Sequence, residues 1–392
     1  MPEAVIVSAL RTPIGTAFRG SLADTLPEET ARVVISETAS RLSVDPSLID
    51  DVVLAESNYG GGDVARHAAI QSGLVHVPGQ AVNRHCAGSL TALQIAAGSI
   101  RAGMDELVIA GGVQSSSLNP AQRRRVPGTT DNWIDDWSSP AHPDSPAAPN
   151  RDMSITVGWN TAVEAGISRK QMDEWALRSH QRAVAAIVAG AFDAEIVPVR
   201  ALQKDGGYKD FRVDEHPRRT TSMERLAALK PLHPEIEGFS ITAGNASGVN
   251  DAAVAVAIAS DRLVRAESLE PLARVRAWAN VGVEPARTGM ALIDVIALVL
   301  RRAGLAIRDI DLWEINEAFA SVPVAVCQAH EIDEARVNTR GSGCSLGHPV
   351  AASGGRMITT LVHQLHASGG GLGVATMCAG GGQAGAIVIE VS

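Results

Sequence analysis

Cysteine is scarce in this chain of 392 residues, and its placement argues against two structural classes. The four cysteines, Cys86, Cys327, Cys344 and Cys378, are widely separated, and no CxxC pair is present. This usage argues against a disulfide framework and against a zinc or other metal site, and it fits a reducing cytoplasm. Aromatic residues are also rare, at 3%, so we expect packing through small side chains and close backbone approach.

Long hydrophobic runs and an excess of basic residues are missing as well. The apolar run AAVAVAIAS (252–260) is far shorter than the roughly 18 residues of a membrane span, and it predicts a buried strand. The first residues lack a basic region followed by an apolar segment, so we expect no signal peptide. A net charge of −9 argues against nucleic-acid binding. We therefore expect a cytoplasmic protein with small-molecule partners, and neither membrane nor nucleic acid among them.

What the chain does contain is a faint internal repeat. ARVVISETASRLSVDPSLIDDVVLAE in the first half and DVIALVLRRAGLAIRDIDLWEINEAF in the second both predict a helix, a short turn and a strand. Each is followed by a Val-Asn entry into a glycine-rich turn and a helix, and each half ends in a strand that runs into glycines. Alternating strands and helices indicate a layered α/β fold with ligands at the carboxyl ends of the strands.

Residues 119–242 interrupt this pattern and predict an inserted loop domain over the site. Residues 127–150 are rich in Pro, Asp and Ser, while 168–190 predict an amphipathic helix with Ser168 as N-cap and Gly190 as terminator. The expected domains are therefore 1–118, completed by about 243–265; the insertion 119–242; and 266–392.

The repeat brings four chemically active residues to matching strand ends: Cys86 in the first half, and Asn316, His348 and Cys378 in the second. Cys86 lies at the start of a predicted helix, where backbone N–H groups and the helix dipole are expected to lower a thiol pKa. The alternative is that Cys86 is a small buried apolar residue. His85 is left out of the site, because adjacent side chains on an extended segment point apart.

Six stretches, in this order and spacing, resemble the thiolase family over essentially the whole chain. They are RTPIGTAFRGSL, VNRHC, TAGNASGVNDAA, INEAFAS, LGHP and MCAGGG. The resemblance implies a duplicated five-layered α/β/α/β/α fold with a loop domain, usually assembled as a homodimer or homotetramer. It also implies an acyl-CoA C-acetyltransferase that makes or cleaves 3-ketoacyl-CoA through an acyl-cysteine, in lipid metabolism such as fatty-acid β-oxidation.

The resemblance also implies the roles of the site residues. Cys86 would carry the acyl group, Cys378 would be the acid–base cysteine, and His348 would polarise the nucleophile and donate to the thioester oxygen. Asn316 would orient a water in that oxyanion hole, and the N–H of Gly380 would hold an oxyanion.

Coenzyme A or acyl-CoA would be the substrate, with no prosthetic group and no metal. Ser247 matches a pantetheine contact, and Arg218 or Arg219 lies near the adenine or phosphate end. Ala318 and Phe319 would line the pantetheine tunnel, although Phe319 could equally be a core residue. Met153 is the last implied contact.

The sequence departs from the family pattern around the expected substrate path. Ala87-Gly88-Ser89 follows the nucleophile, GSGCS precedes LGHP, and Asp152-Met153 stands where biosynthetic relatives have His-Met. The acyl group and the direction of the reaction stay open. A ketosynthase-type condensing enzyme is disfavoured by Cys378, and a non-catalytic acyl-CoA or lipid-binding relative is disfavoured because both Cys86 and Asn316 are kept. GSGCSLG has GxGxxxG spacing, which does not match a dinucleotide-binding loop.

Overall fold

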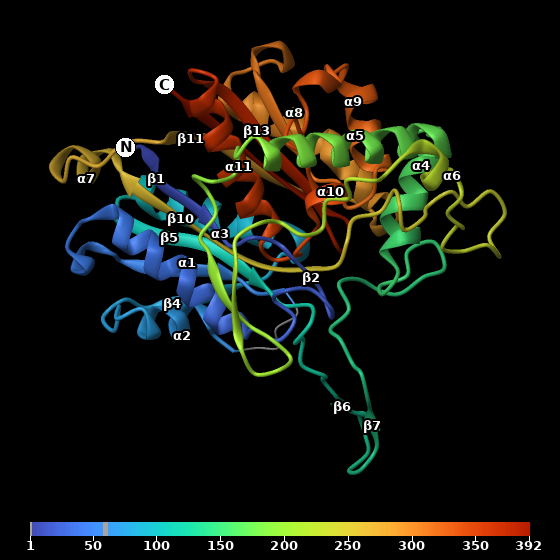
Figure 1. The fold of residues 1–392 in the computed structure, drawn as a ribbon, viewed down its shortest axis with the longest axis horizontal. Coiled ribbons are helices and arrows are strands. Elements are labelled where there is room, and N and C mark those ends of the chain that lie inside the picture. Colours follow the sequence, from blue (N-terminus) through green and yellow to red (C-terminus); the bar gives the residue numbers. More distant parts are fainter. Residues whose placement is uncertain (1, 58–61) are drawn as a thin grey trace.

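A computed structural model describes residues 2–57 and 62–392, which form two half sheets joined at their inner edges (Figure 1). The strand order is β12-β13-β14-β11-β1-β10-β5-β3-β4, with the short β2 on β10. The halves meet through only two residue pairs between β1 and β11. The first half sheet comprises β1 (Ala4–Arg11), β2 (Gly15–Thr16), β3 (Asp51–Ala55), β4 (Gly79–Val82), β5 (Leu107–Gln114) and β10 (Asn250–Ser260). The second comprises β11 (Ala273–Gly282), β12 (Leu312–Ile315), β13 (Gly371–Ala379) and β14 (Gln383–Val391).

The two half sheets repeat one topology, as the sequence predicts. The parallel pair β3–β5 corresponds to the parallel pair β12–β13, and each continues into an antiparallel pair, β5–β10 and β13–β14. The strand β4, which pairs with β3, also has a counterpart in the second half. There a single parallel bridge joins Trp313 of β12 to Val337. The predicted buried strand at 252–260 is β10, which is buried along its whole length.

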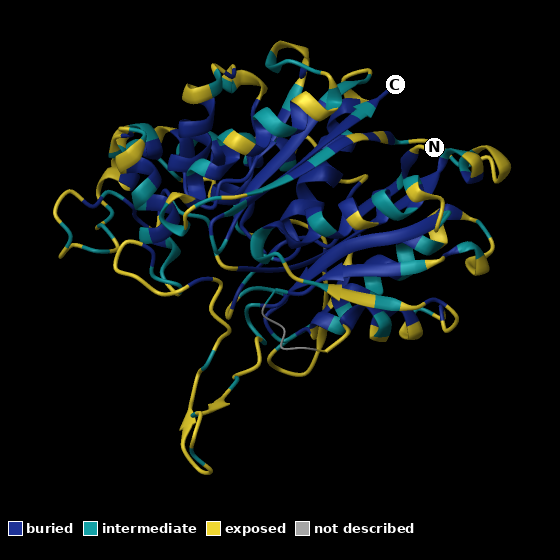
Figure 2. Cartoon of the chain, turned by 180° about the vertical axis from the view of Figure 1, so that it is seen from behind, coloured by how far each residue is buried: buried dark blue, intermediate teal, exposed yellow. Residues whose placement is uncertain are grey.

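The helices form three layers around the half sheets. Helices α3 (Gly88–Ala102) and α11 (Ser353–Ala367) lie between them, and α3, α11 and both sheets share one buried apolar cluster. Helices α1 (Pro27–Leu42) and α2 (Val64–Gln71) cover the outer face of the first half sheet. Helices α8 (Ala291–Ala303) and α9 (Ser321–His330) cover the outer face of the second. The predicted five-layered fold is confirmed, and Figure 2 shows the buried residues concentrated in these layers.

The remaining helices are short or belong to the insertion. They are α4 (Asn160–Glu164), α5 (Arg169–Val188), α6 (Met223–Ala227), α7 (Asp261–Ala266) and α10 (Gly343–Leu346). The predicted amphipathic helix of the insertion is α5, which Ser168 caps in a reciprocal capping box with Gln171. Gly190 follows it with φ +68°, as a helix terminator requires.

The insertion 119–242 contacts both halves and sends out one arm. Arg11 of β1 forms a buried ion pair with Glu195 and another with Asp214, and this ties the insertion to the first half. The arm is a hairpin of β6 (Arg124–Arg125) and β7 (Trp133–Ile134), which projects away from the body (Figures 1 and 2). A second hairpin pairs β8 (Val199–Leu202) with β9 (Tyr208–Phe211). The domain boundaries themselves stay a prediction.

No helix in the described part of the chain is both long and apolar enough to cross a bilayer.

Candidate active site

Cys86 lies in a 3-10 turn, His85–Ala87, that leads from β4 into α3. The turn packs closely, because a Cβ on Gly88 would lie 2.8 Å from the Cβ of Ala55. The thiol of Cys86 accepts a hydrogen bond from the backbone N–H of Gly380. Burial nevertheless raises the pKa of Cys86 to about 11, and the Gly380 amide offsets only part of this. The expectation of a lowered thiol pKa is therefore wrong, because loss of hydration outweighs the helix N-terminus.

Cys378 lies near the end of β13, beside Cys86. Burial raises the pKa of Cys378, and the charge of Cys86 raises it further, so the two thiols are close neighbours. The turn that follows contains Gly380, Gly381 and Gly382, the last two with φ of +86° and +75°. Glycine is the residue type that adopts this conformation without strain.

His348 has its tautomer set by its neighbours. Its Nδ1 lies 2.7 Å from Ser353 Oγ, and that hydroxyl donates its only proton to the carbonyl of Pro349 at 2.9 Å. Nδ1 must therefore be the donor to Ser353, which leaves Nε2 with its lone pair, buried and without a hydrogen-bond partner. Burial, helped by the charge of Arg356, lowers the pKa of His348 to about 4. A neutral imidazole with a free Nε2 can accept a proton from a thiol.

Asn316 follows β12 directly and offers both ends of its amide to the site. Its backbone N–H donates to the carbonyl of Thr376 on β13 at 3.0 Å. Its side-chain Oδ1 and Nδ2 are both buried without a hydrogen-bond partner. Buried amides are normally paired, so unpaired ones call for a bound water or ligand.

The segments that carry Cys86, Cys378 and His348 pack together between the two halves. The turn of Cys86 packs against both β13 and α11. Ser89, three residues after Cys86, accepts the N–H of Gly355 on α11 at 2.9 Å. His348 is also tied to the first half, because its N–H donates to Oδ1 of Asn250 on β10 at 3.0 Å.

Glu317 is a residue that the sequence analysis missed, although it quoted the INEAFAS stretch. Its carboxylate accepts from Trp175 Nε1, Ser179 Oγ and Asn338 Nδ2, and from the backbone N–H of Cys344, at 2.6 to 3.0 Å. It therefore fixes the Asn316 segment to α5 of the insertion and to the segment before His348. Cys344 is buried beside it, which agrees with a packing role.

Three of the residues assigned to pantetheine, Ser247, Ala318 and Phe319, lie next to one another. The N–H of Ser247 donates to the carbonyl of Ala318 at 2.9 Å, and Ala246 bridges to Phe319. Phe319 is buried, and its ring packs against Gly158, where an added Cβ would lie only 2.8 Å from the ring. Met153 begins the π-helix Ser154–Trp159 and packs against the same apolar cluster.

One of the two candidate arginines, Arg218, lies at a cavity. Arg218 helps to line a cavity of about 210 Å³, and its backbone N–H donates to Nδ1 of His180 at 3.1 Å. Arg219 is not among the residues that line it. The remaining lining residues are His180, His216, Thr220, Thr221, Arg225, Leu226, Leu229, Ala243, Gly244 and Cys344.

His85 lies at the site, contrary to the sequence expectation. It has φ +45°, and its N–H donates to Oδ1 of Asn83 at 2.8 Å. The segment is thus a turn rather than an extended strand, so the argument that adjacent side chains diverge does not apply. The ring of His85 faces Gly380, where a Cβ would lie 3.5 Å from the ring.

Comparisons with known proteins agree with this architecture. Family models described as "Thiolase, N-terminal domain" and "Thiolase, C-terminal domain" match residues 4–262 and 269–391. An acetyl-CoA acetyltransferase of Escherichia coli is 40% identical, with 100% of this chain and 99% of the relative covered. A beta-ketoadipyl-CoA thiolase of Acinetobacter baylyi is 39% identical, with both chains covered in full.

Solved structures give the same answer. The Bacillus anthracis acetyl-CoA acetyltransferase superposes with a TM-score of 0.91 at 34% identity, covering 100% of this chain and 99% of that one. Human mitochondrial 3-ketoacyl-CoA thiolase in complex with CoA gives 0.90 at 33% identity, covering 100% and 98%. The chain described here therefore belongs to the thiolase family of acyltransferases.

Proposed function

We propose that Cys86 is the nucleophile of a thiolase that makes or cleaves 3-ketoacyl-CoA through an acyl-cysteine. The observation that carries this is the contact of the Cys86 thiol with the Gly380 N–H, beside Cys378, in a site that also holds the unpartnered Nε2 of His348. The second thiol next to the first favours this chemistry over a ketosynthase, and the intact polar site favours it over a non-catalytic binding protein.

In the first step the thiol proton of Cys86 passes to Nε2 of His348, and the sulfur attacks the 3-keto carbonyl. A thiol with a pKa of about 11 is a neutral reactant, so proton transfer has to accompany the attack. The C2–C3 bond then breaks, the acyl group stays on Cys86, and C2 takes its proton from Cys378. Free CoA next attacks the acyl-cysteine and releases the shortened acyl-CoA. The reverse sequence is the condensation.

Two donor sets would stabilise the charge that develops on the thioester oxygens. The Gly380 N–H lies at the nucleophile, and the amide of Asn316 can hold a water for the other oxygen. Removing one preorganised donor typically costs about 10²–10³ in rate.

We propose that CoA enters along Ser247, Ala318, Phe319 and Met153, with its phosphate-bearing end at the cavity beside Arg218. The positive side chains of Arg218 and Arg225 at this cavity suit phosphate groups, which arginine binds through paired hydrogen bonds. A solved relative that carries CoA in its title supports the use of CoA as substrate.

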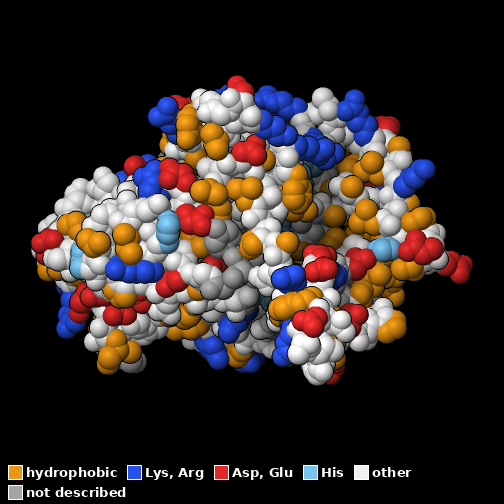
Figure 3. Space-filling view, turned by 90° about the horizontal axis from the view of Figure 1, so that it is seen from below, with side chains coloured by type: hydrophobic (Ala, Val, Ile, Leu, Met, Phe, Trp, Pro, Cys, Tyr) orange, Lys and Arg blue, Asp and Glu red, His pale blue; other side chains and the backbone are white. Residues whose placement is uncertain are grey.

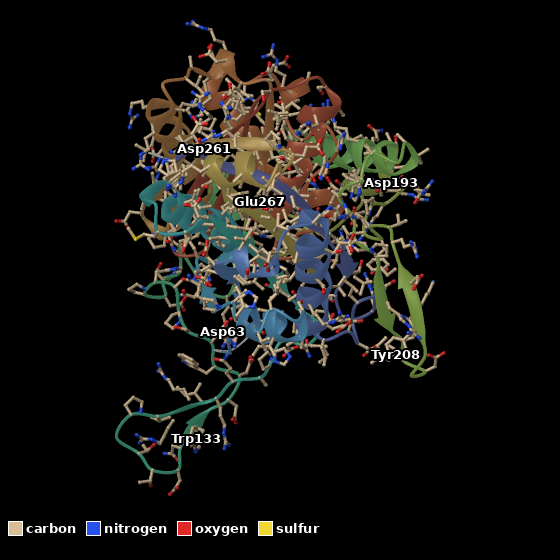
Figure 4. The ribbon with its side chains drawn as sticks, turned by 90° about the vertical axis from the view of Figure 1, so that its left-hand side faces the viewer. Asp63, Trp133, Asp193, Tyr208, Asp261 and Glu267 are labelled. Carbon is tan, nitrogen blue, oxygen red and sulfur yellow. The ribbon has the colours of Figure 1, made fainter. Side chains whose placement is uncertain are left out.

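We further propose a cytoplasmic homodimer or homotetramer that acts in lipid metabolism such as fatty-acid β-oxidation. The projecting hairpin supports assembly, because Trp133 (Figure 4) and Ile134 on its strand β7 are 45% and 42% exposed. Figure 3 views the side on which the hairpin projects, where hydrophobic side chains are interspersed with charged ones. Sedimentation of a Trp133→Ser, Ile134→Ser double variant tests this: a tetramer should fall to dimers, and an unchanged mass would remove the hairpin from the interface.

The catalytic assignment is tested with two single variants. Cys86→Ala should take up no acyl group from acetyl-CoA, whereas Cys378→Ala should still be acylated by acetyl-CoA, a thioester exchange that needs no proton at C2, but should not turn over. Acylation rates are followed by intact-protein mass and turnover by thiolysis of acetoacetyl-CoA. Equal acylation of both variants would refute the assignment.

A further inference from the structure

Two imidazoles near Cys86 have no role in the proposed mechanism. His85 comes from the turn of the nucleophile and His142 from the insertion. Ala141, the neighbour of His142, lies against the Gly380–Gly382 turn, since a Cβ on Gly381 would be 3.1 Å from the Cβ of Ala141. His142 is close enough to His85 for its charge to lower the pKa of His85.

The conformation of His85 is a costly one. Its φ of +45° is uncommon for a residue with a side chain, and strained backbone of this kind concentrates at functional sites. The Asn83 side chain stabilises it by accepting the His85 N–H at 2.8 Å. The result is that the imidazole faces Gly380, the residue whose N–H contacts the Cys86 thiol.

His142 is held rigidly and has one unused atom. Asn150 accepts the N–H of Ala141 and of His142 on Oδ1 and donates from Nδ2 to the His142 carbonyl at 2.7 Å. Nε2 of His142 lies 2.9 Å from the carbonyl of Ala148, which can only accept, so Nε2 carries a proton. Nδ1 is buried without a hydrogen-bond partner in a residue that is only 9% exposed. Nε2 of His348 and the amide atoms of Asn316 are unpartnered in the same way.

Between them the two rings have an unpaired acceptor, His142 Nδ1, and a donor, the N–H of His85. In the neutral His142 ring, Nδ1 has a lone pair that calls for a donor. Burial lowers the pKa of His85, so this ring is neutral near pH 7 and has one N–H to donate. A hydroxyl group matches this pair, because it donates and accepts at once. An acyl chain with a methylene at this position would leave His142 Nδ1 unpaired. A carboxylate there would be repelled, because its oxygens would face the lone pair of Nδ1.

We propose that His85 and His142 select an acyl group that carries a hydroxyl within a few carbons of the thioester. This inference rests on the proposed function, since it assumes that acyl groups reach Cys86. A site built to pair a hydroxyl discriminates strongly against the analogue that lacks it.

The test measures acylation of Cys86 by butanoyl-CoA, by its 3-hydroxy and 4-hydroxy derivatives, and by succinyl-CoA. In each case the thioester C–S bond of the donor breaks, a bond from the carbonyl carbon to Cys86 Sγ forms, and the thiol proton leaves on CoA. Rates come from rapid-quench intact mass. We expect one hydroxy isomer to react at least tenfold faster than butanoyl-CoA, and succinyl-CoA to be the slowest.

Two substitutions separate selection from structural support. His142→Gln keeps a donor for the Ala148 carbonyl but loses the acceptor at Nδ1, so the hydroxyl preference should fall to within about twofold. His142→Asn keeps an acceptor near Nδ1 and should retain the preference. His76→Gln is the matched control, because His76 also binds a backbone carbonyl, that of Pro46, but is exposed.

The outcomes distinguish the two hypotheses. Acylation by every donor at similar rates, or fastest by succinyl-CoA, overturns the hydroxyl site while leaving the thiolase chemistry standing. A preference that survives in His142→Gln also overturns it. No adduct from any donor, including acetoacetyl-CoA, overturns the proposed function itself.

Discussion

Replacing Ser353 with alanine should disable His348 without touching the substrate path. In the native site Ser353 Oγ accepts from Nδ1 at 2.7 Å and donates to the Pro349 carbonyl at 2.9 Å. The alanine variant leaves a buried imidazole N–H unpaired and no longer favours the tautomer with a free Nε2. An unpaired buried donor costs about 1–3 kcal/mol, which corresponds to roughly a 5- to 150-fold loss in rate.

The assay is single-turnover acylation by acetoacetyl-CoA, with steady-state kcat and KM alongside. We expect the loss to fall on kcat, because the role proposed for His348 is in the chemical step and not in CoA binding. Ser260→Ala is the control: Ser260 is also fully buried, but its hydroxyl accepts the N–H of Leu263 at the far end of β10. A folded Ser353→Ala enzyme with kcat within twofold of the parent would refute the reasoning.

Three further predictions follow from the charges in the fold. Because burial raises the pKa of Cys86 to about 11, its alkylation by iodoacetamide should keep rising above pH 9; a plateau near pH 8.5 would contradict this. The pKa values of His180 and His348 are lowered to about 4 from 6.5, so the unfolded chain binds more protons between these limits. Each histidine should therefore lower the free energy of unfolding by at most about 3 kcal/mol as the pH drops from 6.5 to 4, whereas Glu56 and Glu314, whose pKa values burial raises to about 7, act in the opposite direction. In urea titrations His180→Gln should remove that histidine's share of the pH dependence, and a profile unchanged from the parent would count against it. Arg11→Met should cost about 3–5 kcal/mol of stability, because it leaves two buried carboxylates unpaired; a loss below about 1 kcal/mol in the same titration would be incompatible with the ion pairs.

The fold was predictable because its signals are local and occur twice. The repeated helix, turn and strand predicts both half sheets, and Ser168 and Gly190 predict the bounds of α5. The meeting of Cys86 and Cys378 was also within reach, since equivalent strand ends of a duplicated unit converge.

The details of the site that escaped prediction depend on long-range packing. The thiol pKa of Cys86 is decided by how much protein surrounds it, which the helix position alone does not indicate. His85 was misplaced because its left-handed φ depends on the Asn83 side chain, and an extended segment was assumed. Glu317 looked like part of a motif, yet its partners Trp175, Ser179 and Asn338 lie more than 20 residues away in the sequence.

The central claim is the acyl-cysteine on Cys86, and intact-protein mass tests it most directly. The purified protein is mixed with acetoacetyl-CoA in the absence of free CoA, digested and mapped, and a second sample is then chased with CoA. We expect one acetyl group per chain, located on the peptide that contains Cys86 and removed by CoA. An acetyl group on Cys378 or Cys344 instead, or an adduct that CoA does not discharge, would contradict it.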